Sequence, residues 1–414
     1  MDYYKRYMLG TLLLVLMFDY VPWNALGLLL QNIKLELHLS DLQCGVLSGI
    51  AFAIFYSVLG IPLARWADRG NRVRIIAISA VLCGLALTLS GVVASFIQLL
   101  VARIGVAIGE AGCIPAAHSL IAESFDRKQR TKAFSIYQLG FPLSALLATA
   151  AAGWLNELYG WRIAFVVLGL PGIPLGLLAW WTLREPDRRC VDEQTAPPFW
   201  QVCRVLWRNT TFRNLLIGYS IGSFSSLGIN QWSATFFRRC YDFETGELGM
   251  WLASIWGFGG LLGAYLSGVL ASRYAAGNEC RQLRGAALAQ AFFGVMSVGI
   301  YASPTPYVAF TFMTLGVVIV FLSHAPLFSV IQTLVPSNMR ALSIALVLLV
   351  SNLVGVGFGP LAVGALSEAM RHWAGNESLR YAILTLTPGC LITGWFLWRA
   401  GKTVTRDVEK ARAL

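Results

Sequence analysis

The stretch from Ala64 to Arg74 reads ARWADRGNRVR and forms a short charged turn between two long apolar runs, residues 44–64 and 75–95. Each run has the roughly 20 residues that a helix needs to cross the hydrocarbon core of a bilayer. Lipid offers no partners for backbone amides, so such runs must be helical. The same pattern recurs along the chain and predicts twelve transmembrane helices, at residues 8–30, 44–64, 75–95, 97–123, 133–155, 163–183, 212–236, 249–271, 285–302, 306–331, 341–366 and 381–399.

The composition indicates that lipid is the natural solvent of this chain. Of its 414 residues, 57% are hydrophobic and only 13% are charged, whereas soluble proteins carry about 25% charged residues. We therefore expect an all-α membrane protein in contact with the lipid bilayer. The net charge of +11 is compatible with a nucleic-acid partner, but basic loops beside a membrane account for it, and we expect no nucleic acid to bind.

Basic residues are unevenly distributed between alternate loops. With the N-terminus in the cytoplasm, most of the 32 Lys and Arg residues fall in cytoplasmic segments, and the outer loops hold only a few, among them Lys34, Arg238 and Arg239. Cytoplasmic loops of membrane proteins are enriched in Lys and Arg. We therefore expect both termini in the cytoplasm and a multi-pass protein of the cell inner (plasma) membrane.

The chain divides into two halves of six spans each. A polar stretch with Pro197 and Pro198 separates them, and the sequence GVLASR at 268–273, with further arginines beyond it, follows the second span of the second half. Its place matches that of the charged turn in the first half, as a duplicated six-helix unit predicts. We expect two pseudo-symmetric six-helix bundles, residues 1–183 and 212–414, joined by a cytoplasmic linker, residues 184–211.

Three charged residues stand out inside the predicted spans: Asp19, Arg103 and Glu110. An ionised side chain at the bilayer centre costs at least about 2.5–3.5 kcal/mol, so it usually faces protein or water and has a function. Arg103 and Glu110 are seven residues apart, nearly two helical turns, and share a face about 10 Å apart. Because the first span runs outward and the fourth inward, Asp19 falls at the depth of Glu110, and Arg103 lies level with Trp23.

This placement predicts a site for an anionic substrate and a proton. Two carboxylates at one depth in a low-dielectric medium do not both ionise easily, so at least one is expected to take up a proton near neutral pH. Arg103 stays charged and can hold a carboxylate or phosphate in a bidentate grip. We expect Arg103 to bind the substrate and Glu110 or Asp19 to exchange the proton; the alternative is a structural network that ties helices together.

Other polar residues interrupt the spans and are further candidates for substrate binding. They either line a cavity or join helices by hydrogen bonds. With Trp23, they are Tyr137 and Gln138 in the fifth span, Asn230 and Gln231 in the seventh, and Asn352 in the eleventh.

The sequence lacks the common signatures of enzymes and of ATP-driven pumps. It has no H-E-x-x-H, no G-x-S-x-G and no G-x-x-x-x-G-K-[ST] motif, and no His or Cys cluster at zinc spacing. We therefore expect no catalytic residues, no metal, no cofactor and no enzymatic activity. A secondary carrier is the main hypothesis, and a sensor derived from a carrier is the alternative of another class.

The stretch Asp68-Arg69-Gly70-Asn71-Arg72 resembles the signature loop of the major facilitator superfamily, with Ala64 where glycine is usual. Within that superfamily the first half resembles the Spinster-like transporters over roughly residues 37–186. The matching pieces are Leu39-Ser40-Asp41, Leu47-Ser48-Gly49, Gly60-Ile61-Pro62, Arg103-Ile104-Gly105-Val106, Gly109-Glu110-Ala111-Gly112, Tyr137-Gln138-Leu139-Gly140, Gly160-Trp161-Arg162 and Arg184-Glu185-Pro186.

The resemblance implies two bundles around a central cavity that opens alternately to each side, in a protein that we expect to be a monomer. It assigns Arg103 and Glu110 to the substrate and proton site and implies a gate at Asp68, Arg69 and Arg72. The sequence departs from the family pattern in the first span, where Pro22 and Trp23 replace the usual Asp-Arg pair and Asp19 lies one turn earlier.

The resemblance also bears on the substrate. The Spinster-like match implies amphipathic or lipid-derived anions, and the wider superfamily leaves siderophores, organic acids and drugs open.

Overall fold

The fold is given by a computed structural model that describes residues 3–186, 199–274, 278–323 and 340–412, and residues 327, 330, 331, 333 and 334 singly. Side chains at several helical positions, including Asp68 and Arg69, lie outside the described set, as do residues 187–198 of the predicted linker. In the described residues all regular secondary structure is helical. The prediction of an all-α protein is confirmed.

Contacts group the chain into two compact units. The first comprises Met1–Cys190 and Trp232–Gly257, and the second comprises Val191–Gln231 and Phe258–Leu414. The segment Trp232–Gly257 holds the end of one helix and the start of the next, and it packs within the first unit although it follows the linker in sequence.

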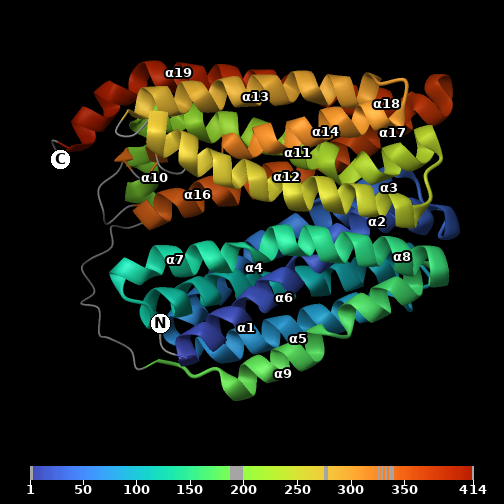
Figure 1. Ribbon diagram of the computed structural model, residues 1–414, viewed down its shortest axis with the longest axis horizontal. Helices are drawn as coiled ribbons and strands as arrows, with labels where there is room; N and C mark the ends of the chain where they lie inside the picture. The colour runs from blue at the N-terminus through green and yellow to red at the C-terminus, as the bar shows by residue number, and fades with distance from the viewer. Residues whose placement is uncertain are drawn as a thin grey trace. The chain divides into compact units, whose positions relative to one another are not determined.

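The first unit is built from nine helices before the linker, shown in blue to green in Figure 1. Within it α5 packs against α6 and α9, α4 packs against α6, and α2 packs against α8. Their bounds are α1 Tyr3–Asp19, α2 Val21–Glu36, α3 Asp41–Ser48, α4 Ile50–Arg69, α5 Arg72–Ser90, α6 Phe96–Ser124, α7 Arg127–Gln138, α8 Gly140–Gly169 and α9 Gly172–Thr182.

The second unit contains most of the helices after the linker, and α13 packs against both α14 and α19 (Figure 1). Helices α11 and α12 each contribute to both units, as the segment Trp232–Gly257 requires. The bounds are α10 Phe199–Arg208, α11 Thr210–Tyr241, α12 Thr245–Tyr274, α13 Glu279–Ala302, α14 Pro306–Leu322, α16 Arg340–Asn352, the π-helix η2 Leu353–Phe358, α17 Gly359–Ala374, the 3₁₀ turn η3 Gly375–Glu377, α18 Ser378–Leu386 and α19 Pro388–Arg412.

Local sequence explains where several helices begin and bend. Ser40 and Gln43 form a capping box at the start of α3, and Asn71 accepts a hydrogen bond from the Arg74 amide at the start of α5. These contacts satisfy backbone amides that have no partner in the first helical turn. Gly160 has φ +83° and bends α8 at a conformation that residues with a Cβ rarely adopt.

Eight helical runs of the described chain are long and apolar enough to cross a membrane. Two of them, Lys132–Thr182 and Leu346–Glu409, have 51 and 64 residues, far more than one crossing requires, and each contains a glycine with positive φ, Gly160 or Gly375. The described residues of the predicted spans are mostly helical, and eight runs rather than twelve separate helices meet the length and hydropathy requirement.

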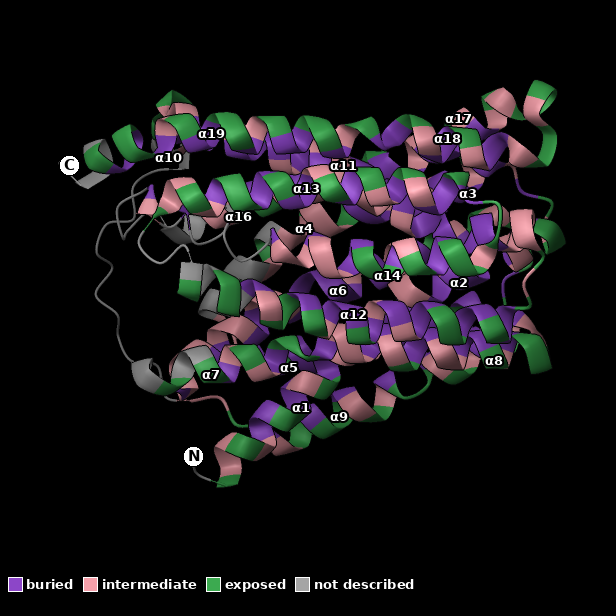
Figure 2. Cartoon of the chain, turned by 45° about the horizontal axis from the view of Figure 1, so that its top comes forward, coloured by how far each residue is buried: buried purple, intermediate pink, exposed green. Residues whose placement is uncertain are grey.

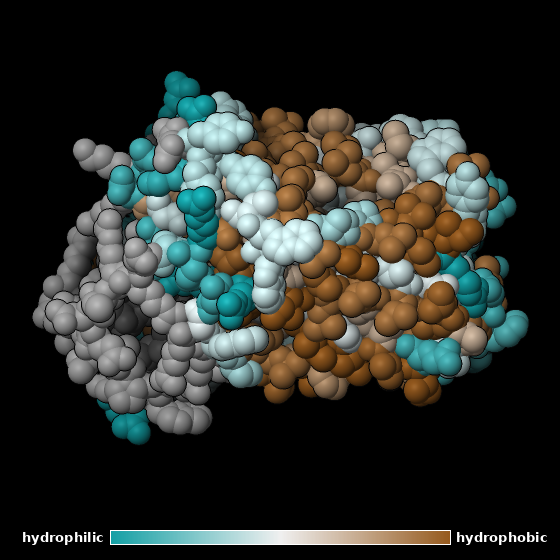
Figure 3. Space-filling model, turned by 90° about the horizontal axis from the view of Figure 1, so that it is seen from below, coloured by the Kyte–Doolittle hydropathy of each residue, from teal (hydrophilic) through white to brown (hydrophobic). Residues whose placement is uncertain are grey.

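The helices carry buried, intermediate and exposed residues in stripes along their length (Figure 2). The face seen in Figure 3 is largely hydrophobic, and hydrophilic side chains gather toward its ends. Large apolar residues are well exposed in the middle of helices, for example Val58 at 63%, Leu262 at 52% and Leu288 at 53%. Such surfaces are unusual in soluble proteins, and they identify the chain as a multi-pass membrane protein.

Candidate functional site

A break between α1 and α2 leaves Asp19 as the last residue of one helix and places Trp23 in the first turn of the next. Tyr20 joins the two helices, and Pro22 has no amide hydrogen, so the helical hydrogen bond at that position is missing. Asp19 is 6% exposed, and its carboxyl group lies beside the Cys113 thiol of α6. The predicted first span is therefore interrupted at its charged residue.

Helix α6 brings Arg103 and Glu110 into the same interior, where they are 2% and 7% exposed. The Glu110 carboxylate lies within electrostatic reach of both Asp19 and Arg103. Gly109 allows α5 to approach closely, since a Cβ at this position would lie 2.7 Å from the Cys83 backbone nitrogen. The structure thus brings together the three charged residues that the sequence singles out.

Arg103 has an incomplete set of partners. Its Nη1 lies 3.5 Å from the Pro22 carbonyl oxygen, and its guanidinium carbon lies 5.6 Å from the centroid of the Phe52 ring. Nε and Nη2 have no hydrogen-bond partner in the described part of the chain. These two nitrogens form one edge of the planar guanidinium, which can hold a carboxylate or phosphate through two parallel hydrogen bonds.

Glu110 and Tyr137 carry further buried polar atoms that have no partner among the residues that the structure describes. One carboxylate oxygen of Glu110 and the hydroxyl of Tyr137 accept or donate no hydrogen bond among the described residues. Tyr137 is fully buried and lies within electrostatic reach of Asp19 and Tyr20. Gln138, the next residue, is exposed at the end of α7 and does not join this cluster.

Trp23, Phe52 and Tyr56 form an aromatic row beside Arg103. The ring centroids of Trp23 and Phe52 are 6.3 Å apart, and those of Phe52 and Tyr56 are 5.4 Å apart with 19° between their planes. The sequence analysis named Trp23 but missed the other two. Phe52 and Tyr56 could have been found from their spacing of four residues within one predicted span, because this spacing places both rings on one helical face.

Three predicted substrate residues belong to the second unit. Gln231 is 2% exposed, and its side-chain nitrogen has no partner among the described residues. Asn230 is half-buried. Asn352 is also half-buried and immediately precedes the π-helix Leu353–Phe358, an element that is frequent at functional sites.

Of the three predicted gate residues, only the Arg72 side chain is among those that the structure describes. It is buried and lies next to two carboxylates. Its Nη1 contacts Glu123, and its Nε lies 3.7 Å from Glu185. Glu185 also accepts hydrogen bonds from the Arg72 amide at 2.7 Å and the Val73 amide at 3.3 Å. The Glu185 carboxylate therefore caps the N-terminus of α5. The helix dipole favours a negative charge at this end.

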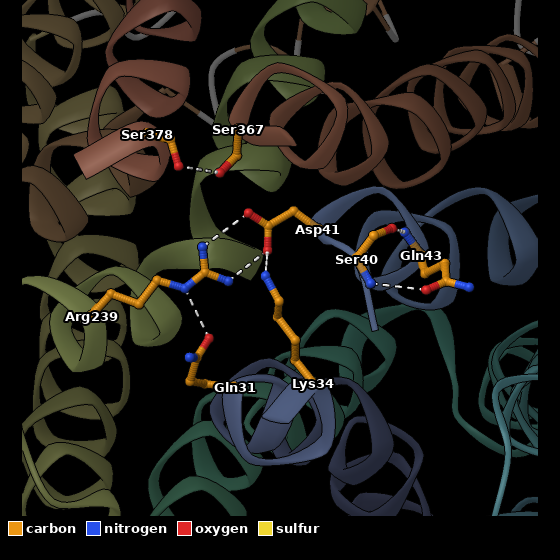
Figure 4. A network of polar contacts seen from close by, with 8 residues as sticks. All are labelled: Gln31, Lys34, Ser40, Asp41, Gln43, Arg239, Ser367 and Ser378. Carbon is orange, nitrogen blue, oxygen red and sulfur yellow. Dashed lines mark hydrogen bonds and ion pairs between the residues drawn. The ribbon is translucent and has the colours of Figure 1, made fainter. Parts of the chain in front are cut away.

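A second ionic cluster lies beyond the opposite end of α4, which has 20 residues and is about 30 Å long. We call Lys34, Asp41 and Arg239 the Asp41 clasp. Asp41 is fully buried and contacts Lys34, while both terminal nitrogens of Arg239 donate to it, at 3.0 and 2.6 Å. Figure 4 shows these side chains converging, with Gln31 accepting from Arg239 Nε at 2.9 Å.

The clasp attaches the segment Trp232–Gly257 to α2 and α3, and this role was not anticipated from the sequence. Arg238 adds a contact to Asn32. The sequence did contain a clue to this cluster. Basic residues are rare in the predicted outer loops, and Lys34, Arg238 and Arg239 are among the few that occur there.

The same segment also packs against α8 through glycines. A Cβ on Gly153 would lie 2.5 Å from the Thr245 carbonyl oxygen and 3.2 Å from the Gly249 Cα. Polar contacts flank this seam: Asn156 donates to the Thr245 hydroxyl at 2.6 Å, and the Gly246 amide donates to Glu157 at 2.7 Å. Close approach of helix backbones through small residues is a common mode of packing in membranes.

In the described residues, an all-helical fold with large exposed apolar side chains and buried ionisable residues at an interrupted helix is typical of a multi-pass membrane transporter. Residues 12–360 match the Major Facilitator Superfamily, and the chain belongs to that family. It is 32% identical to an MFS-type efflux pump of Mycolicibacterium smegmatis, over 97% of this chain and 94% of that one. It is 28% identical to the cis,cis-muconate transport protein of Acinetobacter baylyi, over 63% and 64%.

Among solved structures, the chain is similar to a bacterial homologue of the human lysosomal transporter Spinster in an inward-facing, unoccupied conformation. The TM-score is 0.85 and the identity 26%, covering 98% of this chain and 99% of that one. The resemblance to Spinster-type members of the superfamily is confirmed. The chain is a secondary transporter and not an enzyme.

Proposed function

We propose that this protein carries a small organic anion across the cell inner (plasma) membrane by alternating access, coupled to protons. The observation that carries the proposal is the open guanidinium edge of Arg103. A buried cation with unpartnered donors is costly, and an anionic substrate would satisfy both nitrogens during transport. A purely structural arginine would be expected to have those donors occupied by the protein.

The proton is assigned to Asp19 and Glu110. Both carboxylates lie in the interior near Arg103, and an anion entering this site adds a further negative charge. Uptake of a proton by one carboxylate offsets that charge, because like charges in a low-dielectric interior oppose one another. Substrate and proton binding are therefore coupled at one site, in which Trp23 and Tyr137 also participate.

The second unit supplies the remaining polar groups in this proposal. Asn230, Gln231 and Asn352 bind substrate from the other half of the transporter. Gln138 is a weaker participant, since it is exposed at the end of α7.

The relatives favour an organic acid over a lipid-like anion. The muconate carrier transports a small dicarboxylate, as its name states, and it is similar to this chain over 63% of the length. Export of a drug-like compound is the second candidate, favoured by the similarity to an efflux pump. The charge of the substrate distinguishes the organic-acid carrier from the drug exporter, because a carrier that depends on Arg103 requires an anion.

Alternating access requires contacts that form and break at each end. Arg72, with its two carboxylates, acts at one end together with Asp68 and Arg69. The Asp41 clasp acts at the other end, since it fastens the segment after the linker onto α2 and α3. We assign twelve spans in two bundles, residues 1–183 and 212–414, with cytoplasmic termini, to a protein that acts as a monomer.

Counterflow of radiolabelled benzoate or muconate in proteoliposomes tests this function. Arg103→Lys keeps the charge but removes the planar fork, and charge-assisted hydrogen bonds are worth about 1.5–3 kcal/mol, so substrate affinity should fall about 10- to 150-fold. Arg162→Lys is the matched control, because that side chain is 35% exposed. Equal counterflow by the Arg103→Lys variant and the unsubstituted protein would refute the proposal.

A further inference from the structure

We infer that the aromatic row of Trp23, Phe52 and Tyr56 makes this transporter prefer carboxylates with a flat, unsaturated body over saturated carboxylates of the same size. The inference rests on the proposed function, since it takes the anion at Arg103 as given. It specifies in addition which chemical structure the uncharged part of the substrate has.

The first observation is the order of the groups. The Arg103 guanidinium lies 5.6 Å from the Phe52 ring centroid, and Phe52 lies between Trp23 and Tyr56 in the row. A carboxylate held by Nε and Nη2 lies in the guanidinium plane. The inference places the atoms attached to that carboxylate against the row, because the guanidinium itself lies beside Phe52.

The second observation is the exposure of the rings. Phe52 is 8% exposed, whereas Trp23 and Tyr56 are half-buried. Phe52 is therefore the most buried of the three, and the residues at the two ends of the row retain accessible surface. A row formed only to fill the helix interior would be expected to bury all three rings.

The chemistry of ring surfaces then sets the preference. Aromatic groups meet in offset-stacked or edge-to-face arrangements, and such pairs contribute beyond the apolar area that they bury. A saturated ring has no π face and gains only from burial. The hydrophobic effect alone favours the saturated compound, because it has the larger apolar surface, so the two explanations predict opposite orders of affinity.

Benzoate and cyclohexanecarboxylate form a matched pair of probes, with the same charge and the same number of carbon atoms. We expect the detergent-purified protein to bind benzoate about 2- to 12-fold more tightly in calorimetric titration, the range that one aromatic pair provides. Phe52→Leu and Trp23→Leu should remove this preference while both compounds still bind. Phe52→Tyr should retain it, because the ring remains.

Control variants separate a selective role from a structural one. Phe292→Leu and Trp181→Leu remove rings that are 57% and 76% exposed, and both should leave the affinity ratio unchanged. If Phe52→Leu fails to fold, Trp23→Leu and Phe52→Tyr provide the same comparison of ratios.

The outcomes distinguish this inference from the proposed function. Equal or tighter binding of cyclohexanecarboxylate by the unsubstituted protein overturns the inference and leaves the anion carrier intact. An affinity ratio that survives both leucine variants also overturns it. If neither carboxylate binds and Arg103→Lys changes nothing, the proposed function fails and the inference fails with it.

Discussion

Replacing Asp41 by asparagine is expected to weaken the first unit more than any single change at an exposed ion pair. The substitution keeps the size of the side chain and removes its charge. Lys34 and Arg239, whose side chains are only 9% and 10% exposed, would then share a buried position without a counter-charge. Two like charges would also repel each other across the neutral amide.

The expected loss follows from the burial of all three groups. Removing one partner of a buried ion pair costs about 3–5 kcal/mol, because the remaining charge stays desolvated. Glu36→Gln is the matched control, since Glu36 pairs with Arg162 and these side chains are 52% and 35% exposed. Exposed pairs contribute under about 1 kcal/mol.

Equilibrium unfolding in mixed micelles, followed by circular dichroism, measures both variants against the unsubstituted protein. Hydrogen exchange of the segment Trp232–Gly257 provides a local readout, and Asp41→Asn should accelerate exchange there. Adding Arg239→Gln to Asp41→Asn should recover part of the loss, because one unpaired cation is removed. Losses of similar size in Asp41→Asn and Glu36→Gln would refute the reasoning.

Three further substitutions test other parts of the structure. Gly109→Ala should lower the free energy of unfolding by about 1–3 kcal/mol, because its Cβ would lie 2.7 Å from the Cys83 nitrogen; a thermal midpoint equal to that of the unsubstituted protein would contradict this. Glu185→Gln should cost about 1–3 kcal/mol by weakening its contacts with Arg72 and the α5 amides, and unfolding in micelles would detect it. Glu110→Gln should abolish the pH dependence of substrate counterflow, and an unchanged pH profile would exclude Glu110 as the proton carrier.

Much of the helical structure and the buried charges could be predicted from the sequence. Runs of about 20 apolar residues and the cost of charge in lipid are local properties, so they identified the helices and the trio Asp19, Arg103 and Glu110. The break after Asp19 was less visible, although Pro22 is a local signal for it. Long runs such as Lys132–Thr182 also concealed the positive φ of Gly160.

The remaining features depend on contacts between distant parts of the chain. Asp41 and Arg239 are separated by 198 residues, and Arg72 and Glu123 by 51. A sequence gives the charge of each residue but not the partner that the fold brings to it. The row formed by Trp23 and Phe52 was hidden for the same reason, since its rings come from different helices.

In the proposed alternating-access cycle, the glycines between α8 and α12 would affect how easily these helices separate and rejoin. Gly153 and Gly249 have no side chains to interlock, so separation requires no change of rotamer and leaves no side-chain cavity. The hydrogen bonds of Asn156 and Glu157 would be exchanged for hydrogen bonds with water. Helix packing of this kind would add little to the energy barrier of a repeated movement. The rate of a transport cycle would then depend on the ionic contacts of Arg72 and of the Asp41 clasp.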